Sequence, residues 1–325
     1  MSVFLFRCFL CLVLVICTLF LPLLSHAVQT ADPPPKFDAL FHTGESSPFA
    51  PDTPLLELFY LETKRSDAIF LRCNGRTLLV DGGNKRDFRL LERFLLTENG
   101  SLRVDTILNT HEDNDHLDGL IALLQNGGTA NEFLSPSPAN PKTRRYDKLL
   151  PALKKAEIPY TQVFHGETWQ LGGGHPESGA TLLPGGLETA MPGTALIRMY
   201  CSRINIWDLN RSSLVLHITF GKRTALLMAD ATGKTQWDFL NMGNLELKAE
   251  VYKAPHHGVS GSVEAFLTAV EPKLTVITND RKGSGFQTRQ MQRMAIPTFH
   301  TNEGTVYLAT DGETWYYRQM QLPLR

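Results

Sequence analysis

Four short apolar runs in this chain are each followed, within one to three residues, by an aspartate or a histidine. The runs and the residues that follow them are 76–80 with Asp81, 104–108 with His111, 224–228 with Asp230, and 250–254 with His256. Runs of this length and composition predict buried strands. Polar groups at the ends of neighbouring strands meet at one edge of a sheet. One such residue is usually structural, but four in one chain predict a β-rich fold with a polar site at its edge.

Further strand and helix patterns occur in both halves of the chain. We expect strands at residues 55–61, 68–72, 213–218, 274–278, 305–308 and 314–317, and helices at 90–96, 117–124, 148–156 and 263–269. An Asn-Gly pair, Asn74 and Gly75, is typical of a hairpin turn. Residues 172–193 are rich in glycine and proline and predict an irregular connection. The predicted fold is α/β (α+β), an αββα sandwich of two facing mixed β-sheets flanked by helices.

The composition is that of a folded enzyme and not of a disordered or strongly basic protein. Apolar residues make up 42% of the 325 residues and charged residues 20%. The 32 lysines and arginines balance 33 aspartates and glutamates, so composition gives no argument for general nucleic-acid binding. We interpret the short basic cluster of Lys142, Arg144 and Arg145 as a solvated loop.

The N-terminus has the pattern of a secretory signal peptide. Arg7 precedes an apolar run at 8–24, and Ser25 and Ala27 suit cleavage after Ala27. Residues 1–27 are therefore the predicted signal peptide, 28–54 an extended proline-rich leader and 55–325 the catalytic domain. This predicts an exported protein, periplasmic or secreted. An uncleaved N-terminal membrane anchor is the alternative, because the run approaches the length of a membrane span.

Two cysteines, Cys73 and Cys201, remain outside the predicted signal peptide. In an oxidising compartment they would form either one disulfide or two separate buried thiols, and both alternatives stay open. Neither is part of a CxxC pair, so thiolate ligation of a metal by such a pair is not supported.

The run from His111 to His116 has the composition of a metal site. Four of its residues, His111, Asp113, Asp115 and His116, carry imidazole or carboxylate groups. A hydrolytic centre needs such groups to converge on a cation that keeps a position open for water. Asp230 would bridge two adjacent ions, and the pair His256 and His257 would complete the second ion from another strand. A surface charge cluster is the competing interpretation of the run.

The motifs resemble, in order, those of the metallo-β-lactamase superfamily of hydrolases, and most closely the branch related to the hydrolase-like domain of the ComEC/Rec2 competence proteins. The resemblance covers residues 55–317, and no single motif decides it. The matching segments are Ser66 to Ile69, Leu79 to Gly83, Asn109 to Gly119, Asp208 to Leu216, Leu227 to Ala231, Lys253 to Gly258 and Thr301 to Thr305.

The resemblance implies a binuclear metal site with two zinc ions. Its residues would be His111 and Asp113 on the first ion, Asp115, His116 and His257 on the second, and Asp230 between them. Asp81 would support these ligands from behind. Asp115 would orient the nucleophile or relay its proton, and His256 would contact the leaving group or the substrate oxyanion. Which histidine of the pair is the ligand stays open.

Two positions differ from the broader superfamily. Asp113 stands where many members have histidine, a change shared with the competence-related branch, and Asn210 falls near the place of a further histidine ligand. A third position, Val259, differs from that branch, in which serine is common there. A ligand set with more oxygen atoms and fewer nitrogen atoms favours harder ions, so Mn²⁺ becomes an alternative to Zn²⁺.

The leading hypothesis is an exported metal-dependent hydrolase that cleaves phosphodiester bonds, nucleic acid among its candidate substrates. The first alternative is a carbonyl hydrolase of the lactonase or β-lactamase type. The second is a non-catalytic nucleic-acid-binding accessory protein with the same fold. We expect no transmembrane channel in this chain, because a channel needs several apolar spans.

Overall fold

The computed structural model describes residues 40–44, 46–138, 144–172, 180–182, 191–202 and 208–321. All of them belong to the unit Lys36–Arg325. The predicted signal peptide and residues 28–39 and 45 of the predicted leader lie outside the described residues. Within the described ranges, no helix is both long and apolar enough to cross a membrane.

The described strands form two mixed sheets. The nine-stranded sheet has the order β1-β17-β16-β2-β3-β4-β5-β6-β7. Its strands are β1 (Phe41–Thr43), β2 (Leu56–Tyr60), β3 (Ile69–Cys73), β4 (Arg76–Val80), β5 (Thr106–Leu108), β6 (Glu132–Ser135), β7 (Tyr160–Gln162), β16 (Thr305–Thr310) and β17 (Trp315–Met320). Strands β4 to β7 are parallel, whereas β16, β2, β3 and β4 are antiparallel neighbours.

The eight-stranded sheet has the order β15-β14-β13-β12-β11-β10-β8-β9. Its strands are β8 (Thr168–Leu171), β9 (Ala180–Leu182), β10 (Ala195–Tyr200), β11 (Val215–Phe220), β12 (Arg223–Leu227), β13 (Val251–Lys253), β14 (Leu274–Ile277) and β15 (Thr298–His300). Strands β12 to β15 are parallel, and β12 is antiparallel to β11. Each sheet thus has a parallel part whose strands end at the same edge.

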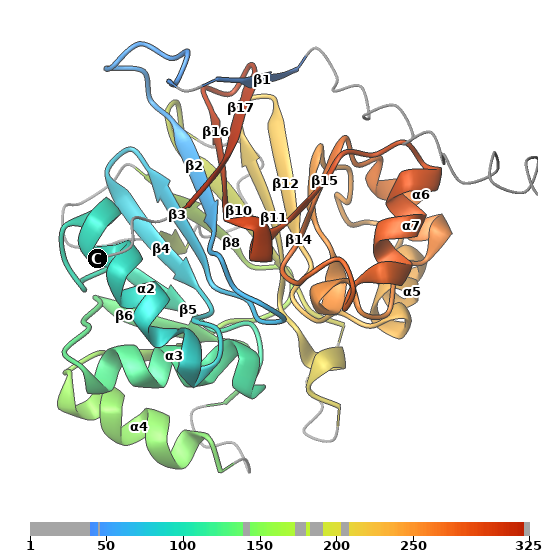
Figure 1. The fold of residues 1–325 in the computed structure, drawn as a ribbon. Helices are drawn as coiled ribbons and strands as arrows, with labels where there is room; N and C mark the ends of the chain where they lie inside the picture. Colours follow the sequence, from blue (N-terminus) through green and yellow to red (C-terminus); the bar gives the residue numbers. More distant parts are fainter. Residues whose placement is uncertain are drawn as a thin grey trace, which may run out of the picture. The chain divides into compact units, whose positions relative to one another are not determined.

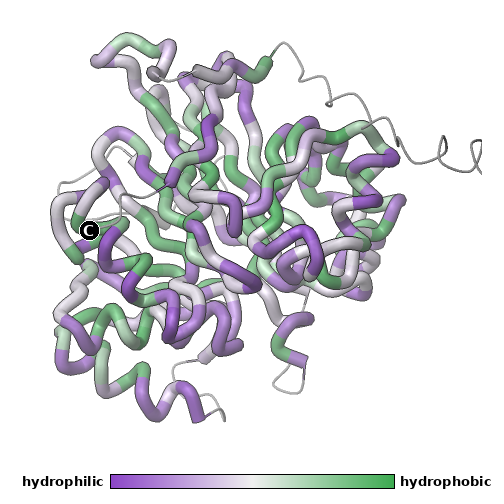
Figure 2. The backbone as a smooth tube through the Cα atoms, in the orientation of Figure 1, coloured by the Kyte–Doolittle hydropathy of each residue, from purple (hydrophilic) through white to green (hydrophobic). Residues whose placement is uncertain are grey.

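The two sheets face each other across an apolar core, and helices cover their outer faces (Figure 1). Leu58 and Leu78 of one sheet share this core with Leu216 and Leu227 of the other. The helices are α2 (Phe88–Phe94), α3 (Asn114–Gln125) and α4 (Tyr146–Lys155) beside the nine-stranded sheet, and α5 (Gly233–Met242), α6 (Glu264–Val270) and α7 (Gly285–Arg293) beside the other. Hydrophobic and hydrophilic residues alternate along these helices (Figure 2), as expected for helices with one buried side. The predicted αββα sandwich is confirmed.

Helix α3 begins earlier than the sequence pattern predicts. The expected helix at 117–124 starts at Asn114, with Asp113 as its N-cap in extended conformation. Asp115 and His116 therefore lie in the first helical turn and not on a loop, a correction to the sequence prediction. Acidic residues at and just after a helix N-cap favour this start. The Asp113 carboxylate makes no capping hydrogen bond, which leaves it available to the site.

The region around residues 172–193 contains more regular structure at its borders than predicted. Strands β8 and β10 flank it and pair with each other, and β9 at 180–182 pairs with β8. Strand β1 also lies inside the predicted leader and pairs with β17. Cys73 and Cys201 are both buried and unbonded, so of the two alternatives the structure has separate thiols.

Candidate metal centre

The strand order brings the sequence-predicted residues together at one edge of the sandwich. Asp81 follows β4 and His111 follows its parallel neighbour β5. Asp230 follows β12 and His256 follows the parallel strand β13 in the other sheet. Because parallel strands end at the same edge, each sheet contributes one half of the centre.

Helix α3 lies unusually close to the turn after β4. A Cβ at Gly119 would lie 1.8 Å from the Gly82 carbonyl oxygen, and one at Gly82 would lie 2.6 Å from the Leu120 nitrogen. The close approach allows the Gly82 amide to donate to the His116 carbonyl (2.8 Å) and the Gly119 amide to donate to the Gly83 carbonyl (2.9 Å). These glycines therefore place the first turn of α3 beside Asp81.

Asp81 orients two imidazoles from behind. Its Oδ2 lies 2.7 Å from Nδ1 of His116 and accepts a hydrogen bond from the Thr110 hydroxyl (2.6 Å). The oxygen of that hydroxyl lies 3.1 Å from Nδ1 of His111. Asp81 Oδ1 accepts from the Thr110 amide and from Asn109. This is the geometry expected of a carboxylate that supports metal-ligating histidines, as predicted for Asp81.

A third imidazole, that of His257, is held in the same way by a different carboxylate. Its Nδ1 lies 3.1 Å from both Asp67 Oδ1 and Thr278 Oγ1. With their Nδ1 atoms occupied, all three rings direct Nε2 to the interior of the centre. The buried atoms His111 Nε2, His116 Nε2, His257 Nε2 and Asp230 Oδ1 have no hydrogen-bond partner among the described residues.

One oxygen of Asp230 faces two of the predicted residues, and a third lies beside one of them. Asp230 Oδ1 lies 3.2 Å from His116 Nε2 and 3.4 Å from His257 Nε2. The same nitrogen of His257 lies 3.4 Å from Asp115 Oδ2. We call Asp115, His116 and His257 the second donor group.

The other oxygen of Asp230 faces two histidines. Asp230 Oδ2 lies 3.9 Å from His111 Nε2 and 3.7 Å from His256 Nε2. His111 Nε2 is in turn 3.6 Å from Asp113 Oδ2. We call His111 and Asp113 the first donor group. A carboxylate whose two oxygens face two sets of donors has the arrangement required of a bridging ligand.

The backbone around the centre is strained at four non-glycine residues. Asp81, Ala229, His256 and His257 have φ angles of 56°, 44°, 48° and 51°. Left-handed conformations of this kind are costly for residues with a Cβ, and they cluster at functional sites. The two consecutive histidines with these φ angles direct their imidazoles to different oxygens of Asp230.

The charges of the centre shift the pKa values of its buried groups. Burial raises the pKa of Asp230, but the positive charges of His257 and His116 outweigh it and hold this pKa well below the usual range. Burial lowers the pKa of His116, but Asp230 and Asp81 raise it well above the usual value. Burial also lowers the pKa of His257, but the negative charges of Asp230 and Asp67 raise it to about 10. Without a cation, protons on these rings balance the carboxylates.

These residues fit a pair of divalent cations. The unpartnered nitrogens are the donor atoms that Zn²⁺ takes from histidine, and the carboxylates of Asp113, Asp115 and Asp230 add oxygen ligands that suit Zn²⁺ or Mn²⁺. His256 differs from the others, since its side chain is 27% exposed and burial lowers its pKa. An uncharged, solvent-reaching imidazole at the rim can contact a substrate.

Asp67 is a residue of the centre to which the sequence analysis gave no role, although it lies in the matching segment Ser66 to Ile69. Potential donor atoms of Asp67, His116, Asp230 and His257 all lie within 4.8 Å of one another. Both Asp67 oxygens already have partners, Thr278 and His257 on Oδ1 and Lys253 on Oδ2. That matching segment was the available signal, but Asp67 precedes a strand, β3, whereas the other residues of the pattern follow one.

Two other polar residues lie near the centre. Asn210 is in a 3₁₀ turn three residues before Ser213, whose hydroxyl accepts from the Asp230 amide (3.2 Å). Arg145, interpreted above as part of a solvated loop, lies with its Nη1 3.7 Å from Asp113 Oδ1. Lys142 is outside the described residues.

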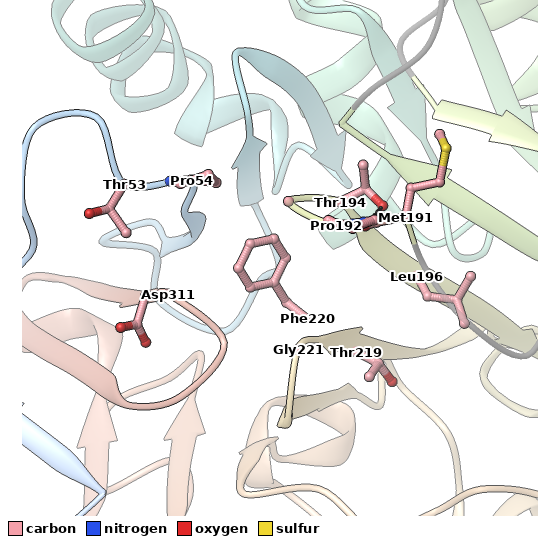
Figure 3. Close-up of a pocket in the computed structure, with 11 residues that line it drawn as sticks. Thr53, Pro54, Met191, Pro192, Thr194, Leu196, Thr219, Phe220, Gly221 and Asp311 are labelled. Carbon is pink, nitrogen blue, oxygen red and sulfur yellow. Dashed lines mark hydrogen bonds between the residues drawn. The ribbon is translucent and has the colours of Figure 1, made fainter.

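One of two cavities lies beside the metal centre, and the other lies far from it. An open groove of about 910 Å³ adjoins Asp113 and is lined by Asn114, Asp118, Arg144, Arg145, Asp147 and Lys148. A second pocket of about 450 Å³ lies beside Phe220 and Gly221, at the far end of β11, and also contacts Asp311 (Figure 3). The start of β11 is the end near the centre, because Leu214 donates to the Thr110 carbonyl. The second pocket is therefore remote from the metal centre.

Comparisons with known proteins agree with this architecture. Residues 62–191 match the model of the metallo-beta-lactamase superfamily. The chain is 24% identical over 276 residues to ComE operon protein 3 of Bacillus subtilis (strain 168), covering 77% of this chain. It spans about a third (32%) of that relative's length. This similarity confirms the predicted relation to the competence-related branch.

Solved structures with similarity to the chain include two proteins of different kinds. The metallo-beta-lactamase fold protein YhfI from Bacillus subtilis is 10% identical, with a TM-score of 0.46, and the match covers 76% of this chain and 96% of YhfI. CmlA, a diiron beta-hydroxylase from Streptomyces venezuelae, is 16% identical, with a TM-score of 0.47. The match covers 83% of this chain and 55% of CmlA. Residues 62–191 of this chain are thus similar to the metallo-β-lactamase superfamily, and the two facing sheets of the fold agree with that similarity.

Proposed function

We propose that this protein is a binuclear metal-dependent hydrolase that cleaves phosphodiester bonds. The observation that supports it most is Asp230, whose two oxygens face separate donor groups in a buried centre. His111 and Asp113 would hold the first ion, and Asp115, His116 and His257 the second. When bound, two such ions stabilise charge on the attacked group and lower the pKa of a coordinated water.

The remaining residues of the centre have separate roles in this proposal. Asp115 is partly exposed, at 23%, and faces the centre, so it can orient the attacking water and accept its proton. Burial raises the pKa of Asp115, but the imidazole of His257, 3.4 Å away, and the charge of His116 lower it below the usual value, so the carboxylate is ionised. His256, at the exposed rim, would contact the leaving group or a substrate oxygen.

The substrate class is proposed from the charges beside the centre. Arg144, Arg145 and Lys148 line the open groove that adjoins Asp113, although Asp118 and Asp147 line it too. Guanidinium groups next to a divalent metal site suit an anionic phosphodiester better than a neutral lactone or β-lactam.

A substrate panel tests the proposed function. The metal-loaded protein should hydrolyse bis-p-nitrophenyl phosphate or single-stranded DNA, and Asp115→Ala and His116→Ala should remove that activity. Turnover of a lactone or nitrocefin instead would assign the protein to the carbonyl hydrolases. No turnover together with DNA binding would favour the non-catalytic accessory protein. Phosphodiesterase activity that survives both substitutions would show that the assigned centre is wrong.

Arg145→Ala should weaken substrate binding more than it slows turnover. A guanidinium hydrogen bond to phosphate contributes about 1.5–3 kcal/mol, so we expect KM for a phosphodiester to rise about 10-fold or more with a smaller change in kcat. Steady-state kinetics at two salt concentrations measure both. Arg89→Ala, which removes an exposed arginine of α2, is the matched control. Equal KM values for Arg145→Ala and wild type would exclude Arg145 from the substrate site.

Metal binding should release protons. At pH 7 the raised pKa values keep His257 and His116 protonated in the metal-free chain. A metal ligand must be deprotonated, so we expect about two protons to be released and the metal affinity to rise with pH. His257 therefore stabilises the metal-free fold below pH ~6.5 and loses that contribution as the pH rises towards its pKa of about 10. Calorimetry in buffers of different ionisation enthalpy counts the protons, and a buffer-independent heat would contradict the expectation.

We also infer that the protein is exported, on the signal-peptide pattern of residues 1–27. N-terminal sequencing of the mature protein should begin at Val28. A chain that keeps its N-terminal segment and stays with the membrane fraction would instead support the anchor.

A further inference from the structure

A buried ion pair between Asp67 and Lys253 lies behind the metal centre, and the roles proposed above do not use it. The side chains are 2% and 0% exposed. Asp67 lies just before β3 of the nine-stranded sheet, and Lys253 is the last residue of β13 of the eight-stranded sheet. The pair therefore links the two sheets that each contribute half of the centre.

Asp67 is bound to the second donor group through both its backbone and its side chain. Its amide donates to the Asp115 carbonyl (3.1 Å), and its own carbonyl accepts from the Gly83 amide (2.6 Å). Its Oδ1 accepts from the Thr278 hydroxyl (2.6 Å) and lies 3.1 Å from His257 Nδ1. Any displacement of Asp67 would therefore move His257 relative to Asp115.

Lys253 is bound to the backbone that directs Asp230. Its Nζ donates to the Ala229 carbonyl (2.9 Å), and the same carbonyl accepts from the His256 amide (2.9 Å). Ala229 has the left-handed φ of 44° and immediately precedes Asp230. A lysine ammonium at this carbonyl holds the strained turn in one conformation.

We propose that the Asp67–Lys253 pair is a positioning device that fixes Asp230 and His257 relative to Asp115 and His116. This inference rests on the proposed function, because the geometry it sets is that of the same metal centre. A buried ion pair is weak evidence for stability, since replacement of both charges by neutral groups of similar size is often tolerated. The contacts of this pair, however, all lead to the centre or to the turn before it. Asp67 acts through His257 and not as a ligand, because both its oxygens have other partners.

The test compares this pair with an ion pair inside one sheet. The double variant Asp67→Asn, Lys253→Met removes both charges and keeps the side-chain volumes, so no single buried charge is left unpaired. Glu57→Gln, Arg72→Met is the matched control, because these partners bridge β2 and β3 away from the centre. Metal affinity is measured by chelator competition, metal stoichiometry by elemental analysis, and ligand geometry from the visible spectrum of the Co²⁺-substituted proteins.

We expect the double variant to fold, to bind metal about 10–100-fold more weakly and to show an altered Co²⁺ spectrum. The control should match wild type in both readouts, whatever stability it loses. A folded double variant with wild-type affinity and spectrum would overturn the inference and leave the proposed function intact.

The single variant Asp67→Asn provides a second readout. If it loses one equivalent of metal while Lys253→Met does not, Asp67 is a ligand and the inference is wrong. A wild-type chain that binds no metal would overturn the proposed function itself.

Discussion

Asp230→Asn is expected to remove at least one of two bound metal equivalents and to lower hydrolytic activity by roughly 10³-fold or more. The substitution keeps the shape of the side chain, but it removes the negative charge and one of two oxygens that face separate donor groups. Oδ1 lies 3.2 Å from His116 Nε2, and Oδ2 lies 3.9 Å from His111 Nε2. Because the two ions would share this one carboxylate, its loss should affect both.

Glu92→Gln is the control for Asp230→Asn. Glu92 is a carboxylate of helix α2 that pairs with Arg89 and belongs to neither donor group. It should retain two equivalents of metal and nearly full kcat. Elemental analysis and kinetics on the same preparations give both quantities. An Asp230→Asn protein that keeps two equivalents and wild-type activity would show that Asp230 does not bridge the ions.

Gly119→Ala is expected to destabilise the fold by about 3 kcal/mol or more, because the new methyl group would overlap backbone and not a flexible side chain. Its Cβ would lie 1.8 Å from the carbonyl oxygen of Gly82 and 3.0 Å from that of Gly83. Relief of the overlap requires α3 to move away from the turn after β4. That movement separates His116 from Asp81, so metal affinity should fall together with stability.

Urea unfolding of the metal-free proteins measures the stability loss of Gly119→Ala, and chelator competition measures its affinity. Gly233→Ala is the control, because Gly233 opens helix α5 and its added Cβ would meet Val263 at an ordinary 3.7 Å. Alanine there should change stability by no more than about 1 kcal/mol, and a gain is expected from its helix propensity. Equal stabilities of the two variants would contradict the close approach of α3 to β4.

The fold class and most of the centre could be predicted because the relevant signals are local. Apolar strands followed by Asp81, His111, Asp230 and His256 are visible in the sequence, and parallel strands bring such ends together. The start of α3 was misplaced by three residues, because apolar periodicity begins at Leu117 while the helix begins with polar residues after Asp113. Helices α5 and α7 were missed because many of their residues are polar.

The residues that hold the centre in place could not be predicted, because their roles depend on contacts between distant segments. Asp67 and Lys253 are 186 positions apart in the sequence, and only the pairing of the two sheets brings them together. Arg145 looked like part of a solvated loop, yet α4 places it beside Asp113. The order of the histidine pair was open as well, and it depends on the strained φ angles of His256 and His257.

The most direct test of the two-ion centre is anomalous diffraction from crystals of the Zn²⁺- or Mn²⁺-loaded protein. We predict two peaks separated by the Asp230 carboxylate. One should lie between Asp230 Oδ1 and the second donor group of Asp115, His116 and His257, and the other between Oδ2 and the first donor group of His111 and Asp113. Peaks that avoid Asp230, or a single peak bound by Asp67, would contradict the account.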